Sequence, residues 1–238
     1  MTFSNRLDLN KFFLHVQDEE YAVIKLNDNF PNYYGGGDID IFCASGDEFA
    51  RKILEVGNEY VAQGFVIDTD CSKDNKINID FYVNDKLDFR FDIYKALPAY
   101  EHMQMKQWFF YSVIDRRKAM KRKYDEKEYR VYIPDEIDDL ILRYIEYCEW
   151  HERRPDKIGH LAFVQNALSS EVKRNRFFDR LYLYAALPES AGINSEDKFH
   201  ISRKIYRSFV FSTRKIRETP LREIPGKILK RMFKLTKA

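Results

Sequence analysis

A glycine turn that runs directly into an alternating acidic strand constrains the fold of this chain most. Residues 35–42 read Gly-Gly-Gly-Asp-Ile-Asp-Ile-Phe. Because successive side chains of a strand point to opposite faces, Asp38 and Asp40 share one face and the intervening isoleucines share the other. An isolated Asp-x-Asp pair is often the solvated face of an edge strand. The three glycines and the apolar strand exit favour a functional site here.

The two aspartates predict a binding site for a hard divalent cation. Two carboxylates held side by side repel each other unless a cation lies between them. Oxygen ligands on a rigid strand suit Mg²⁺ (or Mn²⁺), which typically keeps waters and nucleotide phosphate oxygens in its coordination shell. Gly35, Gly36 and Gly37 carry no Cβ and let the backbone approach a phosphate closely. The pattern indicates phosphoryl or nucleotidyl transfer.

The apolar pattern around this strand predicts a compact α+β unit over residues 1–98. Apolar runs and alternating patterns predict its strands over 21–26, 38–44, 64–68, 76–83 and 87–94. A helix is expected over 47–62, because its apolar residues recur at helical spacing on one face. The predicted order is therefore strand, strand, helix and then three strands.

The residues after about 100 are predicted to form a helical domain over 99–218. Pro134, followed by Asp135 and Glu136, is typical of a helix start. Further helices are expected near 157–169, 171–187 and 196–212. The last segment, 219–238, interleaves Lys and Arg with apolar residues, so it is predicted to be a basic amphipathic tail.

Transfer chemistry with two metal ions needs a further carboxylate to anchor the second ion. The predicted hairpin offers Asp80 and Asp92. A three-residue loop at 84–86 would pair 83 with 87, 81 with 89, 79 with 91 and 77 with 93, which separates an apolar face from a polar one. In that register Asp80 lies opposite Arg90, whereas Asp92 has no ion-pair partner. Asp92 is therefore the predicted third ligand, and Asp80 is the alternative.

Charge is distributed unevenly along the chain. Residues 203–238 carry 12 Lys/Arg and 2 Asp/Glu, against 28 Lys/Arg and 36 Asp/Glu in residues 1–202. The basic tail predicts an anionic partner, such as lipid at a membrane surface. The alternative is a tail that packs on its own domain with a solvated basic face. The acidic body argues against a broad groove for a polyanion, so nucleic acid is not an expected partner.

The remaining composition indicates a cytoplasmic protein. The three cysteines match no zinc or disulfide spacing, which predicts reduced thiols. The N-terminus lacks an apolar signal core, and no apolar run reaches the length of a membrane helix. The expected location is the cytoplasm, with peripheral contact at the inner face of the membrane through residues 219–238 as a further option.

The glycine turn, the acidic strand, the helix and the later acidic strand resemble the nucleotidyltransferase superfamily with the DNA polymerase β-type fold. They look like a bacterial branch of it whose first strand carries an apolar-Lys segment, here residues 23–26 (Val-Ile-Lys-Leu). The resemblance implies a mixed-sheet nucleotidyltransferase core and a helical C-terminal domain. Residues 153–161 look similar to a charged segment that lies near the active cleft in such proteins; a solvated helix start is the alternative interpretation.

The resemblance also implies the roles of the site residues. Asp38, Asp40 and Asp92 would be catalytic metal ligands, with Lys25 as a phosphate contact and glycines 35–37 near the triphosphate. The chain departs from the family in one respect. Many members separate a Gly-Ser pair from the acidic pair, whereas here the glycines directly precede the first aspartate.

The activity implied is Mg²⁺-dependent transfer of a nucleoside monophosphate from an NTP to a hydroxyl or phosphate acceptor. The acceptor would be a glycan, a lipid-linked molecule or a small molecule, as in surface glycan assembly. One alternative is a transferase that moves a phospho-alcohol from a CDP-activated donor onto a glycan. Another is a pseudoenzyme that binds a nucleotide without turnover. A glycosyltransferase is disfavoured, because too few residues precede the acidic pair to form its nucleotide-binding region.

Overall fold

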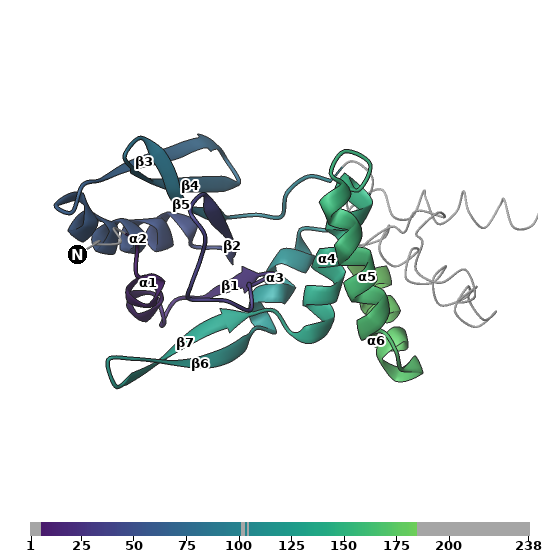
Figure 1. The fold of residues 1–238 in the computed structure, drawn as a ribbon. Coiled ribbons are helices and arrows are strands. Elements are labelled where there is room, and N and C mark those ends of the chain that lie inside the picture. The colour runs from purple at the N-terminus through teal and green to yellow at the C-terminus, as the bar shows by residue number, and fades with distance from the viewer. Residues whose placement is uncertain (1–5, 101–102, 104, 185–238) are drawn as a thin grey trace, which may run out of the picture.

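The computed structural model describes residues 6–100, 103 and 105–184 (Figure 1). Its helices are Leu9–His15 (α1), Gly46–Val61 (α2), Trp108–Asp115 (α3), Glu136–Trp150 (α4), Ile158–Ala167 (α5) and Glu171–Tyr184 (α6), with a 3₁₀ turn at Pro155–Lys157. Its strands are Tyr21–Ile24 (β1), Gly37–Cys43 (β2), Phe65–Lys73 (β3), Lys76–Val83 (β4), Lys86–Tyr94 (β5), Lys118–Tyr124 (β6) and Lys127–Ile133 (β7).

The first five strands form one sheet in the order β1-β2-β5-β4-β3. Strands β2 and β5 are parallel, and the other neighbouring pairs are antiparallel. Helix α2 lies between β2 and β3 in the chain, and it packs against β2, β3, β4 and β5 (Figure 1). The predicted α+β class with a mixed sheet is therefore confirmed.

The two faces of the sheet have different environments. Odd-numbered residues of β2 and β5, such as Ile39, Ile41 and Phe91, are buried in one core with α1 and α2. Strand β1 contributes to a core on each face: Val23 belongs to the core under α2, and Ala22 belongs to a second core built mainly from α3, α4 and α6. Burial on both faces explains why β1 consists of apolar and aromatic residues throughout.

The pairing of β4 with β5 confirms three of the four predicted pairs and corrects the fourth together with the predicted turn, because Val83 pairs with Lys86 and not with Leu87. Ile77 pairs with Ile93, and Phe81 pairs with Phe89, as expected. The loop, however, contains two residues, because Asn84 and Asp85 adopt positive φ angles of 51° and 59°, as tight hairpin turns require. A register shift after Phe81 absorbs the difference, so the apolar face is preserved.

The region expected to be helical contains a β-hairpin, which corrects that prediction. Strands β6 and β7 pair over 118–133 around a turn at Asp125 and Glu126, whose φ angles are 45° and 65°. The hairpin packs back against β1 and α1, and it places Tyr129 and Val131 in the first core. The many Lys and Arg residues of β6 and the absence of glycine from the turn concealed this hairpin.

Helix α4 begins as the sequence predicts. Asp135 caps it by accepting a hydrogen bond from the backbone N–H of Asp138, and acidic residues occupy its first turn. Its apolar stripe, which includes Ile141 and Tyr144, is buried in the second core. The helix predicted near 196–212 and the tail at 219–238 lie outside the described residues. Within the part that is described, no helix is long and apolar enough to cross a membrane.

Candidate active site

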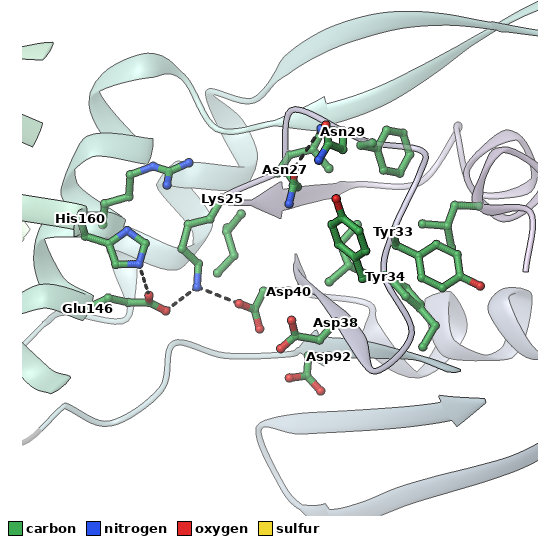
Figure 2. A pocket seen from close by; sticks show the side chains of 18 of the residues that line it. Lys25, Asn27, Asn29, Tyr33, Tyr34, Asp38, Asp40, Asp92, Glu146 and His160 are labelled. Atoms are coloured by element: carbon green, nitrogen blue, oxygen red, sulfur yellow. Dashed lines mark hydrogen bonds and ion pairs between the residues drawn. The ribbon is translucent and has the colours of Figure 1, made fainter. Parts of the chain in front are cut away.

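Strand register brings the three predicted carboxylates to one place on the sheet. Asp40 of β2 is the neighbour of Asp92 of β5, and Asp38 is the neighbour of Arg90. Because β2 and β5 are adjacent and in register, these side chains project from the same face, opposite α2. Figure 2 shows the carboxylates of Asp38, Asp40 and Asp92 gathered side by side. The two aspartates of the motif and the later one thus form a single acidic cluster.

The glycine turn sets the entry angle of β2. Gly36 has a φ of +79°, and a Cβ on Gly37 would come within 2.9 Å of the carbonyl oxygen of Tyr34. The backbone N–H groups of Gly36 and Gly37 donate to the carbonyl oxygens of Asp88 and Tyr34, each at 2.9 Å. Two of the three glycine amides therefore hold the turn in place within the chain.

Lys25 leaves β1 in a left-handed backbone conformation, with a φ of 56°. The predicted strand over 21–26 therefore ends at Ile24. In a continued strand Lys25 would follow Val23 toward the α2 face. Instead its Nζ donates to Oδ2 of Asp40 at 2.8 Å and to Oε1 of Glu146. The turn of the backbone thus places this cation against the acidic cluster.

Glu146, from α4, connects the sheet with the helices that follow. Besides Lys25, its carboxylate binds Nζ of Lys157 at 3.1 Å and lies 3.3 Å from Nε2 of His160. Burial alone would raise the pKa of the Glu146 carboxyl, but Lys25 and Lys157 outweigh burial and lower that pKa. Burial lowers the pKa of His160, although Glu146 opposes the shift. The lowered pKa favours the neutral imidazole at pH 7.

Asp92 has an ion-pair partner that the sequence reasoning did not foresee. Nζ of Lys76 lies 2.7 Å from Oδ2 of Asp92, which corrects the expectation of an unpaired carboxylate. The other oxygen, Oδ1, is buried and has no hydrogen-bond partner within the described residues. Burial raises the pKa of the Asp92 carboxyl, with Lys76 acting in the opposite direction.

The alternative third ligand, Asp80, is fully engaged elsewhere. Its two carboxylate oxygens accept from Nε and Nη2 of Arg90 at 2.5 and 2.6 Å, and the hydroxyl of Tyr82 donates to the second of them at 3.1 Å. Asp80 therefore has the structural ion pair that its register predicts.

A cavity of about 760 Å³ opens above the acidic cluster. One wall is basic and comes from the C-terminal half of the described chain: Arg143, Arg154, Lys157 and His160. The opposite wall is the loop between β1 and β2, with Asn27, Asn29, Asn32 and Tyr34. Figure 2 shows the three carboxylates between His160 and Glu146 on one side and Tyr34 on the other. The segment at 153–161 therefore reaches the same cavity as the acidic pair.

The three glycines lie differently with respect to this cavity. Among the residues that the structure describes, Gly37 lines the cavity, whereas Gly35 and Gly36 do not. Gly35 is exposed in the turn before β2, where the nearest atom to an added Cβ would be Nη2 of Arg6, at 3.8 Å. The hydrogen bond from Gly36 to Asp88 holds this end of the turn at β5. Contact of Gly35, Gly36 and Gly37 with a triphosphate stays a prediction.

The side chains offer the right atoms for a divalent cation but do not enclose one as they stand. In the described part of the chain, no group of three or more His, Cys, Asp or Glu residues is arranged to hold a metal ion. Lysines bind one oxygen of Asp40 and one of Asp92. Oδ1 of Asp92, which accepts no hydrogen bond within the described residues and lies 4.0 Å from Nε of Arg90, and the exposed Asp38 are hard oxygen donors beside them. The cluster thus supplies oxygen donors of the kind that Mg²⁺ prefers, and lysines occupy one oxygen of Asp40 and one of Asp92.

The sequence did not predict the two residues that form ion pairs with Asp92 and Lys25, namely Lys76 and Glu146. Lys76 could have been found, because its even number places it on the polar face of the hairpin together with Asn78 and Asp80. Glu146 carried no such signal, since an acidic residue on an amphipathic helix is usually a solvated one. The interaction of Glu146 with Lys25 spans 121 residues of sequence.

Comparisons with models of protein families, with curated proteins and with solved structures found no match to this chain. An interpretation of its function therefore rests on the geometry and chemistry of the site itself.

Proposed function

We propose that this chain is a metal-dependent nucleotidyltransferase, which moves a nucleoside monophosphate from an NTP to a hydroxyl or phosphate acceptor. The observation that carries the proposal is the acidic cluster: Asp38, Asp40 and Asp92 on adjacent parallel strands, at the floor of a cavity with a basic wall. Oxygen ligands on one side and cations on the other are what a metal–triphosphate complex requires.

Asp38, Asp40 and Asp92 would hold Mg²⁺. When bound there, the ion would supply charge neutralisation at the phosphoryl oxygens and a lower proton affinity of the acceptor. The rigid strand pair fixes the carboxylates relative to one another, so the substrate meets a preorganised site. In this proposal the mixed sheet corresponds to the nucleotidyltransferase core that the resemblance implies. The helices after it correspond to the helical C-terminal domain.

The basic wall would bind the phosphates that are not transferred. Lys157 is largely buried, with a side-chain exposure of 14%, and Arg154 is exposed at 59%. A cation that is shielded from water attracts an anion more strongly than one at the surface. Tyr34, which is 78% exposed and lines the opposite wall, offers an aromatic face for a nucleobase or a sugar.

Calorimetric titration with ATP, CTP, GTP and UTP, each with Mg²⁺ or Mn²⁺, tests the proposal. We expect metal-dependent binding of at least one nucleotide, and loss of that binding in Asp38→Ala/Asp40→Ala. Strand β3 provides a matched control, because Asp68 and Asp70 form a second Asp-x-Asp pair on an exposed edge strand. The variant Asp68→Ala/Asp70→Ala should bind as the wild type does.

Two outcomes would contradict the proposal. Equal binding by the wild type and by Asp38→Ala/Asp40→Ala would remove the acidic cluster from the site. Binding of CDP-linked donors without binding of any triphosphate would favour the phospho-alcohol transferase. Release of pyrophosphate during incubation with candidate acceptors then separates an enzyme from a nucleotide-binding pseudoenzyme.

A further inference from the structure

Lys25 occupies an oxygen of Asp40, one of the carboxylates that would hold the divalent cation of the proposed function. Its Nζ lies 2.8 Å from Oδ2 of Asp40 and also contacts Glu146. The three side chains are only 13%, 20% and 19% exposed. Solvent and salt screen an ion pair of this kind much less than a surface pair. A divalent cation therefore competes with a resident ammonium group for this carboxylate.

The backbone conformation of Lys25 depends on the contacts of its side chain. With a φ of 56°, Lys25 lies in the left-handed region of backbone conformation, which residues other than glycine and asparagine rarely adopt. Such a conformation persists where surrounding interactions hold it. The ammonium group of Lys25 provides two of them, one to β2 and one to α4. The contact with Asp40 is thus a built feature of the site.

Glu146 gives Lys25 a second partner on a different element. Its Oε1 accepts from Lys25, while its Oε2 faces Lys157 and His160. A buried charge left without a partner costs several kcal/mol. If Lys25 releases Asp40, it keeps the contact with Glu146 and avoids that penalty. A metal ion could therefore replace Lys25 at Asp40, because Lys25 would keep Glu146 as an ion-pair partner.

We infer that Glu146 is a positioning residue, which holds Lys25 away from Asp40 when a divalent cation binds. Lys25 and Glu146 together set the affinity of the acidic cluster for the cation. This inference rests on the proposed function, because it assumes that Asp38 and Asp40 bind a metal.

The test is a double-mutant cycle on the full chain, with Mn²⁺ alone as the probe and its dissociation constant as the readout. Free Mn²⁺ is measured by electron paramagnetic resonance for the wild type, Lys25→Gln, Glu146→Gln and the double variant. We expect Lys25→Gln to tighten binding about tenfold and Glu146→Gln to weaken it about fivefold. In the Lys25→Gln background, Glu146→Gln should change the constant by less than about twofold, because the competitor is absent.

If Glu146→Gln weakened Mn²⁺ binding equally in the wild type and in Lys25→Gln, the inference would be overturned. The negative charge of Glu146 would then act on the metal ion directly and not through Lys25. Unchanged binding by Lys25→Gln would overturn the inference as well, and that variant suffices if Glu146→Gln does not fold. In both cases, wild-type binding that Asp38→Ala/Asp40→Ala abolishes would leave the metal site of the proposed function standing. Failure of the wild type to bind Mn²⁺, with or without nucleotide, would overturn the proposed function and this inference together.

Discussion

Asp40 and Asp92 are neighbours across the parallel pair β2–β5, yet each carboxylate is bound by a different lysine. Lys25 approaches Asp40 from the end of β1, and Lys76 approaches Asp92 from the start of β4. The two cations offset the repulsion that adjacent carboxylates would otherwise produce. Two of the three carboxylates of the cluster are thus neutralised from within the chain. In the proposed function a metal ion would take over that neutralisation.

Asp92→Asn should destabilise the fold and abolish metal-dependent nucleotide binding. The substitution leaves the ammonium group of Lys76, which is 14% exposed, beside a neutral amide. We expect a loss of about 1–3 kcal/mol in the free energy of unfolding, measured with urea. The double variant Lys76→Met/Asp92→Asn should regain stability but not nucleotide binding. Nucleotide binding that survives in either variant would exclude Asp92 from the ligand set.

Asp80→Asn should reduce stability without affecting nucleotide binding. Hydrogen bonds from Arg90 hold the pKa of the Asp80 carboxyl below its usual range. The stabilisation is therefore present above about pH 4, the pKa of an unfolded Asp, and is lost as the pH falls through the lower folded pKa. The free energy of unfolding of Asp80→Asn should fall less steeply with acid than that of the wild type.

At pH 7 we expect Asp80→Asn to cost about 1–2 kcal/mol in unfolding free energy, because it breaks a paired charge. Asp68→Asn serves as the control, since Asp68 is exposed on β3 opposite Asp80. Nucleotide affinity measured by calorimetry should change less than about twofold in both variants. A large loss of affinity in Asp80→Asn alone would make Asp80 the third ligand.

Gly57→Ala should destabilise the chain although alanine favours a helix. A Cβ at Gly57 would lie 2.9 Å from two ring atoms of Phe81, which is completely buried. Overpacking of this kind costs about 1–3 kcal/mol, against a gain in helix propensity of about 1 kcal/mol. Asn58→Ala, on the exposed side of the same helix, should be neutral or stabilising. Urea unfolding of both variants decides whether α2 packs this closely on the sheet.

Tyr33→Phe should loosen the loop that forms one wall of the cavity. The hydroxyl of Tyr33 donates to the buried carboxylate of Asp88 and accepts from the backbone N–H of Leu7 at 2.7 Å. Its removal leaves both groups unsatisfied, so we expect a loss of about 1–3 kcal/mol in unfolding free energy. Tyr34→Phe, at a residue that is 78% exposed, should change stability by less than about 0.5 kcal/mol. Equal stability of the two variants would contradict this role of Tyr33.

Local pattern was sufficient for the sheet around the acidic pair. The alternation in β2, β4 and β5 predicted the strands, and the separation of apolar from polar faces predicted that Ile79 pairs with Phe91. The local pattern did not predict the hairpin of β6 and β7, because the charged residues of β6 conceal its strand character. Strand β6 is rich in Lys and Arg, and its pairing depends on Tyr129 and Val131 of β7, which pack in a core formed by distant segments.

The glycine turn shows the same limit at the site. Its composition indicated a backbone that can approach a phosphate, but it could not indicate which glycine faces the cavity. That depends on the hydrogen bond from Gly36 to Asp88, a residue of β5, which leaves Gly35 outside the cavity and Gly37 in its lining.

Local sequence was enough to show which side chains share a face, because the period of a strand sets the direction of each side chain relative to its neighbours. That is why Asp38 and Asp40 could be assigned to one site. Which cations contact these carboxylates depends on how distant elements pack together. The contact of Lys25 with Glu146 depends on a left-handed residue at the end of β1 and on the packing of α4. No local period encodes an interaction between elements so far apart in the chain.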